Sequence, residues 1–373
     1  MLSLQPRGTT SIFWSWCSPL LALALTAIIA GAIFAFMGRP PVFTVYTFLV
    51  SPLFATDGLA SLAVKAAPLI MMGVGLSLAY RANIWNIGTE GQFTLGAIAA
   101  GGMALAFPDA PAWALYPSVI LAGLIGGIVW ALIVAWLRTG FNANEILTSL
   151  MLTYIAQYLL VYLVTGPWRD PEGFGFPQTA MFPDAANGPR LIEGGNLHLG
   201  IVLAPIIAVA AGLVLRRTVL GFQLRVLGQA PRAARFAGFS ENRLVWLAMA
   251  ISGGLAGLAG VFEVTGTQGQ LTTSIGPGYG FTAIIVAFLG RLNPIGVVPA
   301  GLLLALTYLG GDAAQITLGL SNSITGIFQG ILLFCLLGAD VLILHRITWR
   351  PRRVPKPASA TPAAPKAIQG AGA

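Results

Sequence analysis

Residues 81–97 read RANIWNIGTEGQFTLGA and separate two long apolar stretches of the chain. The first stretch ends at Tyr80, and the second resumes near Phe93. Between them lie an arginine, two asparagines, a glutamate and several glycines, which are poor residues for an apolar helix. The fold must explain why a polar, helix-breaking segment lies between two stretches that resemble membrane spans.

The composition places the whole chain in lipid. Of 373 residues, 56% are hydrophobic and only 9% are charged, with a mean hydropathy of +0.82. A soluble protein would carry about 25% charged residues. We therefore expect an all-α, polytopic membrane protein. The two cysteines, Cys17 and Cys335, predict neither a disulfide framework nor a metal site.

Apolar stretches long enough to span a bilayer recur along the chain. The first is too long for the apolar core of a signal peptide, so we expect an uncleaved helix, although the AGA at 30–32 resembles a cleavage site. We predict about ten spans, near residues 19–37, 60–80, 88–107, 115–137, 146–165, 198–215, 244–263, 279–291, 295–311 and 323–344.

The basic residues fix the orientation, because lysine and arginine stay on the cytoplasmic side. With the N-terminus inside, only Arg39, Arg169 and Arg190 fall outside, and Lys65 lies within a span. The other basic residues are inside, at positions 7, 81, 138, 216, 217, 225, 232, 235, 243, 291, 346, 350, 352, 353, 356 and 366. Both termini are therefore predicted to be cytoplasmic. The net charge of +8 reflects this asymmetry and the attraction to anionic membrane lipid, and it does not indicate a nucleic-acid partner.

This topology divides the chain into three parts. Residues 1–18 form a cytoplasmic head, 19–345 form the transmembrane domain, and 346–373 form a basic, then Ala/Pro-rich tail that we predict to be disordered. Two loops exceed turn length: 166–197 outside and 216–243 inside. These loops are the surfaces that partner proteins could bind.

Enzyme chemistry is not supported by the motifs. The segment ISGGLAG at 251–257 imitates the signature of ABC ATPases, but it lies inside an apolar span, and no Gly-Lys-Ser/Thr phosphate loop exists. His198 and His345 lie in distant end regions, and no catalytic constellation or metal-spaced cluster appears. We predict no catalytic residue, metal or bound cofactor in this chain.

Glycines in two spans predict close helix packing. Gly253, Gly254, Gly257 and Gly260 form a smooth helix face, and similar spacing occurs at residues 123–127. Small residues at such spacing let helix backbones approach closely in lipid.

The inner loop contains start and stop signals for one short helix. Pro231 suits the first turn and Gly238 suits the end of such a helix. Arg232 and Arg235 would share a basic face, with Ala233 and Phe236 on an apolar face. So short a helix persists only when it is docked, although a basic inner loop without a partner is the alternative reading.

Polar residues within or beside spans are the other functional signal, because each is costly in lipid. Lys65 is expected to reach the outer interface, and Asn144 is expected to cap the helix that begins at Glu145. Glu263, Gln268 and Gln270 cluster at the outer end of the seventh span. They either line a path or belong to a solvated loop.

The opening segment resembles a known signature, Asn-Ile-Gly-x-Glu-Gly-Gln, of permease subunits in ABC importers for nucleosides and related sugars. These permeases belong to the larger ribose and branched-chain amino-acid permease group. The resemblance extends from about residue 60 to 345 and includes NEILTSLMLTYIA at 144–156, GFQLRVLGQAPRAARFAGFS at 221–240 and GPGYGFTAIIVAFLGRLNPIG at 276–296.

The resemblance implies a type II importer fold and a set of partners. These are a second, similar but non-identical permease, cytoplasmic ABC ATPases that bind ATP and Mg, and an external solute-binding protein. Gln92, in the sequence EGQ, is similar to the longer of two permease types that pair as heterodimers. The expected location is the bacterial cytoplasmic (inner) membrane, and the inner helix at 231–238 resembles the coupling segment that contacts the ATPase.

The polar segment then has two candidate roles: an inner turn between spans two and three, or a break that exposes Asn83, Asn86, Glu90 and Gln92 to the solute path. We favour the path, because buried polar groups usually mark function. Few charges in the path suit a neutral, hydroxyl-rich solute such as a nucleoside or sugar. The alternative function is an ion-coupled secondary transporter, which would need inverted repeats and midplane charges that the chain lacks.

Overall fold

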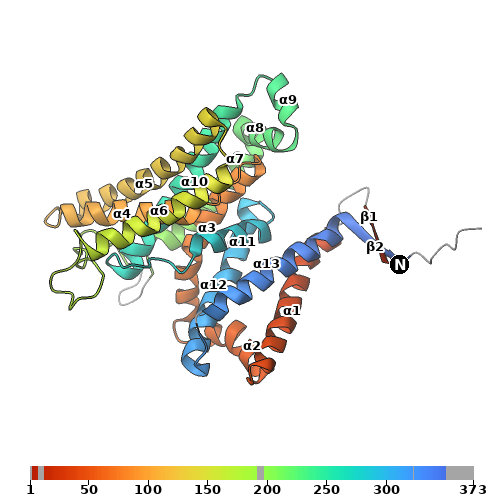
Figure 1. The fold of residues 1–373 in the computed structure, drawn as a ribbon, viewed down its shortest axis with the longest axis horizontal. Helices are drawn as coiled ribbons and strands as arrows, with labels where there is room; N and C mark the ends of the chain where they lie inside the picture. The colour runs from red at the N-terminus through yellow and green to blue at the C-terminus, as the bar shows by residue number, and fades with distance from the viewer. Residues whose placement is uncertain (1, 7–11, 191–196, 322, 350–373) are drawn as a thin grey trace, which may run out of the picture.

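The computed structural model describes residues 2–6, 12–190, 197–321 and 323–349 as a helical bundle (Figure 1). Parts of the predicted head (1 and 7–11), outer loop (191–196) and tail (350–373), together with residue 322, lie outside the described residues. The helices are α1 Ile12–Phe36, α2 Pro41–Leu49, α3 Gly58–Arg81, α4 Thr89–Ala106, α5 Ala112–Phe141, α6 Glu145–Thr165, α7 Leu199–Arg217, α8 Val219–Gln229, α9 Pro231–Phe236, α10 Glu241–Glu263, α11 Tyr279–Leu289, α12 Pro294–Leu318 and α13 Ser323–Leu344. A 3₁₀ turn, Ser51–Phe54, precedes α3, and a π-helical turn, Val264–Gln268, extends α10.

Each of the ten predicted spans coincides with one of these helices. Within the described ranges, seven helices are long and apolar enough to cross a membrane: α1, α3, α5, α6, α7, α10 and α12. The other three predicted spans are α4, α11 and α13. Helix α11 has only 11 residues, about 17 Å of helix, which is too short for a hydrocarbon core of about 30 Å. Helix α4 begins with the polar sequence TEGQ, which lowers its hydropathy. The chain is therefore a polytopic membrane protein with spans of unequal length.

The polar segment at 82–88 is a turn that folds back into the bundle. Helix α3 ends at Arg81, and Asn83 adopts a left-handed conformation with φ of 59° that reverses the chain. Ile84 and Asn86 are buried, whereas Asn83 is exposed. The segment is thus a turn, which lies on the inner side in the predicted topology, and Asn86 within it is enclosed by protein.

Helix α10 lies at the centre and packs against α3, α4 and α5 (Figure 1). The close approach depends on glycine. A Cβ on Gly257 would overlap the carbonyl oxygen of Gly123 on α5, and a Cβ on Gly96 of α4 would overlap the backbone of Gly257. The predicted packing role of this glycine face is confirmed.

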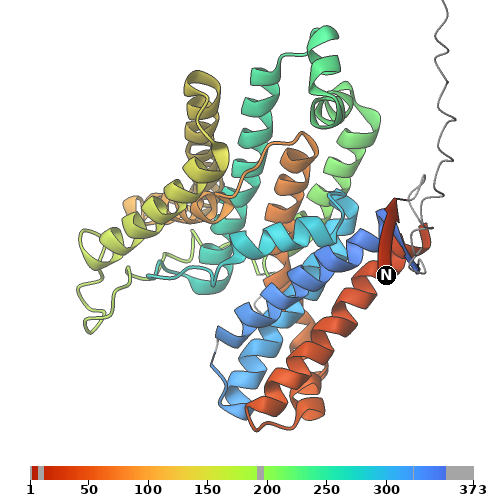
Figure 2. The ribbon, with the colours of Figure 1, turned by 45° about the vertical axis from the view of Figure 1, so that its right-hand side comes forward.

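The two ends of the described chain meet at one side of the bundle. Helix α1 packs along α13 (Figure 2), and α2 packs against α12. The rings of Phe48 on α2 and Phe328 on α13 stack with centroids 4.9 Å apart. Strands β1 (Leu2–Pro6) and β2 (His345–Trp349) pair antiparallel, with Leu2 opposite Trp349. The all-α prediction omitted this small sheet, which includes the first four residues of the predicted tail. The two strands are about 340 residues apart, so no local sequence pattern indicates that they pair.

The two long loops are partly structured. The inner loop contains α8 as well as the predicted helix α9, and α8 was not predicted. In the outer loop, Gln178 pairs with Thr272 in an isolated bridge, and the backbone N–H of Thr179 donates to the carbonyl of Leu271 at 3.0 Å. The outer loop is therefore held against the segment that follows α10.

Candidate functional site

The start of α4 carries a buried hydrogen-bond cluster that ties it to α10. The Asn86 Nδ2 donates to Gln92 Oε1 at 2.9 Å, and Gln92 Nε2 donates back to Asn86 Oδ1 at 3.0 Å. The same Nδ2 donates to Ser252 Oγ at 2.9 Å, which lies in the ISGGLAG segment of α10. Reciprocal amide bonds satisfy polar groups that would otherwise be costly at this depth. The sequence predicted Asn86 and Gln92 as functional but gave no sign of Ser252.

Glu90 lies between α4 and α11. Its side chain is 3% exposed, and its Oε2 accepts a hydrogen bond from the backbone N–H of Gly280, in the first turn of α11. Gly278, directly before α11, is left-handed with φ of 80°, and a Cβ on Gly280 would overlap the backbone of Glu90. A carboxylate at a helix N-terminus is favoured by the helix dipole and by the unpaired N–H groups there. Glu90 therefore holds the short helix α11 in place.

A second buried polar cluster joins α11, α12 and α13. Thr282 Oγ1 lies 2.7 Å from the hydroxyl of Tyr308 and donates to Gln329 Oε1 at 3.0 Å. Gln329 Nε2 donates to Thr307 Oγ1 at 3.1 Å. The sequence reading missed this cluster, although a glutamine within the apolar span 323–344 was a visible signal.

Tyr279 connects the two polar regions. Its ring lies edge-on to Phe93 at a centroid distance of 6.2 Å and edge-on to Tyr308 at 5.1 Å. Glu90 and the cluster around Thr282 are thus parts of one polar and aromatic layer across four helices.

Two of the three outer predicted residues interact with each other: Gln268 makes a side-chain hydrogen bond to Glu263, whereas Gln270 contacts the outer loop. Glu263 is buried at the end of α10 and interacts electrostatically with Lys65, which pairs with Asp312 at 3.3 Å. Gln268 Nε2 donates to the carbonyl of Ile275. Gln270 Nε2 donates to Gln178 Oε1 in the outer loop at 3.3 Å. Glu263 and Gln268 lie at a π-helical turn, a feature that is frequent at functional sites. Gln270 instead holds the outer loop against this segment.

His198 acts as a helix cap. It immediately precedes α7, and its Nδ1 accepts a hydrogen bond from the N–H of Gly200 at 3.2 Å. Its ring stacks on Phe262 with centroids 5.9 Å apart. The contacts account for this histidine as a packing and capping residue.

The predicted inner helix is α9, and it is the most exposed helix of the inner loop. Pro231 occupies its first position, the helix ends at Phe236, and Gly238 follows with φ of 78°. Phe236 is 93% exposed, and Arg232, Ala233 and Arg235 are also exposed. Only Ala234 of this helix is buried. A fully exposed phenylalanine beside basic residues is typical of a protein-binding surface.

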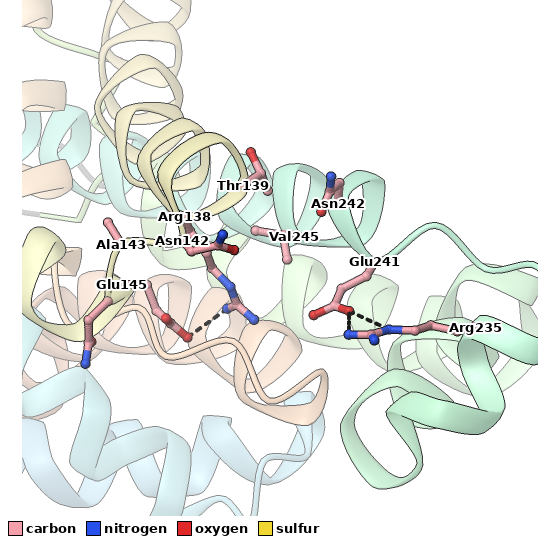
Figure 3. A pocket seen from close by; sticks show the side chains of 10 residues that line it. Arg138, Thr139, Asn142, Ala143, Glu145, Arg235, Glu241, Asn242 and Val245 are labelled. Atoms are coloured by element: carbon pink, nitrogen blue, oxygen red, sulfur yellow. Dashed lines mark hydrogen bonds and ion pairs between the residues drawn. The ribbon is translucent and has the colours of Figure 1, made fainter.

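A polar cleft of about 510 Å³ lies beside α9 (Figure 3). One wall is the turn from α5 to α6, where Arg138 and Glu145 pair at 2.7 Å. The other is the turn from α9 to α10, where Arg235 and Glu241 pair at 2.9 Å. Each ion pair braces one turn, so the cleft has two stiffened walls. Asn144 caps α6 as predicted, with its Oδ1 accepting from the N–H of Ile146 at 2.9 Å.

Helix α6 presents tyrosines on its outward face. Tyr154, Tyr158 and Tyr162 are exposed, and Gln157 between them is partly exposed. Tyr154 is the tenth of 21 residues in α6, about 14 Å from its start, and therefore lies near mid-span. Tyrosine belongs to membrane–water interfaces, and glutamine is costly in hydrocarbon. This face of α6 is chemically suited to a partner or a watery passage rather than to lipid.

Comparison with known proteins places this architecture in a family. Residues 58–337 match the family described as branched-chain amino acid transport system / permease component. The chain belongs to this family. The match covers α3 to most of α13, including the polar turn and the inner loop.

Named relatives of this permease transport sugars and nucleosides. The glucose ABC transporter permease protein TsgB13 of Haloferax volcanii is 35% identical over 93% of this chain and 93% of its own length. The guanosine ABC transporter permease protein NupP of Bacillus subtilis is 29% identical, over 84% of this chain and 91% of its own. The nucleoside ABC transporter permease protein NupB of Lactococcus lactis is 27% identical, over 78% and 82%. The permease is thus a multi-pass subunit of an ABC transporter in the cytoplasmic membrane, and the ion-coupled alternative is set aside.

Proposed function

We propose that this permease forms half of the path for nucleosides in an ABC importer and couples to a separate ATPase through α9. The ATPase supplies the sites for ATP and Mg. A second, non-identical permease completes the path, and an external solute-binding protein docks on the outer loop. The family and the relatives for guanosine and nucleosides support this proposal.

The main support for a solute path is the exposed polar and aromatic face of α6. Tyr158 is 74% exposed in the single subunit, and Tyr154 and Gln157 flank it on the same helix. A nucleoside offers hydroxyl groups for hydrogen bonds and a flat base for stacking on aromatic rings. Apposition of this face with the second permease would enclose a passage lined by neutral polar and aromatic groups. That chemistry suits a neutral, hydroxyl-rich solute.

Uptake competition tests the solute class. In cells that depend on this transporter, unlabelled adenosine, guanosine or cytidine in excess should suppress uptake of a labelled nucleoside by more than about tenfold, because all share the ribose and a flat base. Glucose and free bases should compete weakly. The relative TsgB13 makes glucose the decisive control. Strong inhibition by glucose with none by nucleosides would show that the permease transports sugars and would reject the nucleoside assignment.

The polar residues at the start of α4 are proposed to shape the wall of the path. At the inner end, hydrogen bonds connect the turn and the start of α4 to α10 and α11, through Asn86, Glu90 and Gln92. At the outer end, the wall would be formed by Glu263 and Gln268 at the π-helical turn. A solute would contact them when α4 separates from its neighbours during transport. Asn83 and Gln270 would contribute at the two mouths of the path.

Glu90→Gln should slow uptake several-fold without lowering the amount of permease in the membrane. The amide keeps an oxygen for Gly280 but loses the charge, and a hydrogen bond to a charged group contributes about 1.5–3 kcal/mol. Initial uptake rates at matched membrane levels measure the effect. Asp57→Asn, the same acid-to-amide change at an exposed position, is the control and should transport normally. Normal transport by a well-inserted Glu90→Ala variant would discard the role of Glu90.

A further inference from the structure

Three arginines converge at the inner end of the bundle. Arg81 is the last residue of α3, Arg216 lies in the last turn of α7, and Arg225 lies on α8. Arg81 interacts electrostatically with both of the others. We refer to these three residues as the inner arginine cluster.

Close backbone contacts hold α8 against the ends of α3 and α7. A Cβ on Gly228 would overlap the carbonyl oxygen of Arg81, and a Cβ on Gly221 would overlap the backbone of Leu215. Only glycine permits both approaches. The cluster is therefore fixed by the packing of three helices rather than by flexible side chains alone.

The inner arginine cluster has no acidic partner among the described residues. The ion pairs within the described ranges join Lys65 to Asp312, Arg138 to Glu145 and Arg235 to Glu241, and none includes an arginine of the cluster. Arg81 donates from Nε to the carbonyl of Leu292 at 2.7 Å, and Arg225 donates from Nε to the carbonyl of Gly221 at 3.2 Å.

These bonds orient both guanidinium groups and leave their terminal nitrogens available to a ligand. Cations in the last turn of a helix are favoured by its dipole, which accounts in part for Arg81 and Arg216 but not for Arg225 within α8. Three positive groups held together repel one another, and an anion with several acceptor oxygens would relieve that repulsion.

Apolar side chains are exposed on the same short helix. Val219 is 70% exposed and Phe222 is 53% exposed, and Phe222 packs edge-on against Phe239 at 6.2 Å. The basic residues place this end of the bundle at the cytoplasmic surface of the membrane. A short helix with exposed apolar residues and neighbouring arginines is suited to the interface of the inner leaflet. A free phosphate would use only the arginines, whereas a phospholipid offers a phosphate and an apolar chain together.

We propose that the inner arginine cluster binds the phosphate of an anionic phospholipid of the inner leaflet, with Val219 and Phe222 contacting its acyl region. The site lies beside α9 but is distinct from it. The proposed ATPase contact uses the outlying residue Phe236, whereas this site uses helix ends that are packed against the bundle. The lipid site is independent of which solute the transporter carries.

Lipid binding to the purified transporter tests the proposal. The full permease, assembled with its partner subunits in detergent, is titrated with phosphatidylglycerol or phosphatidylcholine, and bound lipid is counted by native mass spectrometry. R216Q/R225Q should weaken phosphatidylglycerol binding by at least about tenfold, because it removes two of the three guanidinium groups proposed to hydrogen-bond the lipid phosphate. R225Q alone should give an intermediate loss and covers the case in which the double variant folds poorly.

The matched control is R217Q/R243Q, which removes two exposed inner arginines outside the cluster. It should change phosphatidylglycerol binding by less than about twofold, and phosphatidylcholine binding should be equal in all variants. Equal phosphatidylglycerol affinity in both double variants would overturn the proposal. So would displacement of the lipid by millimolar inorganic phosphate, which would make this a phosphate site. Loss of the ATPase from R216Q/R225Q with lipid binding unchanged would instead identify the cluster as a protein-docking patch.

Discussion

Replacing Phe236 with alanine should abolish solute uptake while the permease still inserts into the membrane. Phe236 projects from α9 with 93% of its surface exposed, so its removal costs the folded subunit little. If Phe236 is buried in a pocket of the ATPase, it is an interface hot spot, and its truncation to alanine reduces the binding free energy by about 2–4 kcal/mol. The ATPase should then be retained about 30- to 1,000-fold less tightly. Co-purification of the ATPase with tagged permease, alongside uptake at matched membrane levels, measures both effects.

Two further variants make this result specific. Phe54→Ala removes another exposed phenylalanine, on the 3₁₀ turn before α3, and should keep both uptake and the ATPase. Arg232→Gln should cost less than Phe236→Ala, because an exposed ionic contact contributes at most about 1 kcal/mol. Full uptake together with full ATPase retention in Phe236→Ala would exclude α9 as the coupling contact.

Gly257→Val should prevent the bundle from assembling and should reduce folded permease in the membrane by at least about fivefold. The first added carbon would overlap the carbonyl oxygen of Gly123 on α5, and the facing Gly96 of α4 leaves no room to move away. Overpacking by side-chain atoms typically costs about 1–3 kcal/mol, and a clash between two backbones exceeds that range. Membrane level and thermal stability in detergent measure the loss.

Gly330→Val is the matched control for this crossing. Gly330 is exposed on α13, and a Cβ there would meet no atom within 4 Å. The same substitution in a helix should therefore leave the membrane level nearly unchanged. If both variants accumulate equally, the crossing of α4, α5 and α10 does not depend on the absence of a side chain.

Much of the fold was readable because it depends on local composition. Apolar runs predicted ten helices, and seven of these, within the described residues, are long and apolar enough to cross a membrane. The glycines at 253–260 predicted the tight crossing of α10. Pro231 and Gly238 predicted the start and end of α9 to within two residues. Helix α8 was not predicted because its 11 residues include two glycines, which are poor helix formers. Strands β1 and β2 were missed because their pairing joins residues at opposite ends of the chain.

The polar layer was only partly readable, because its partners are distant in sequence. Asn86, Glu90 and Gln92 stood out as polar residues between apolar spans. Their partners did not: Ser252 lies within an apolar helix, and Gly280 contributes only a backbone N–H, 190 residues from Glu90. The segment forms a turn, which was one of the two alternatives of the sequence reading: Asn83 is exposed and Asn86 is buried. The other alternative, exposure of its polar residues to the solute path, stays a prediction.

The pairing of α1 with α13 has a consequence for synthesis of the permease. Within this chain α1 is synthesised before α13, yet the two helices pack along each other, and β1, before α1, pairs with β2, after α13 (Figure 2). The first span must therefore wait in the membrane, without its final neighbour, until almost the whole chain has been translated. During that delay the exposed flank of α1 needs temporary cover by lipid or by the insertion machinery. A ribosome that stalls before α13 would leave a subunit in which α1 also lacks its packing partner.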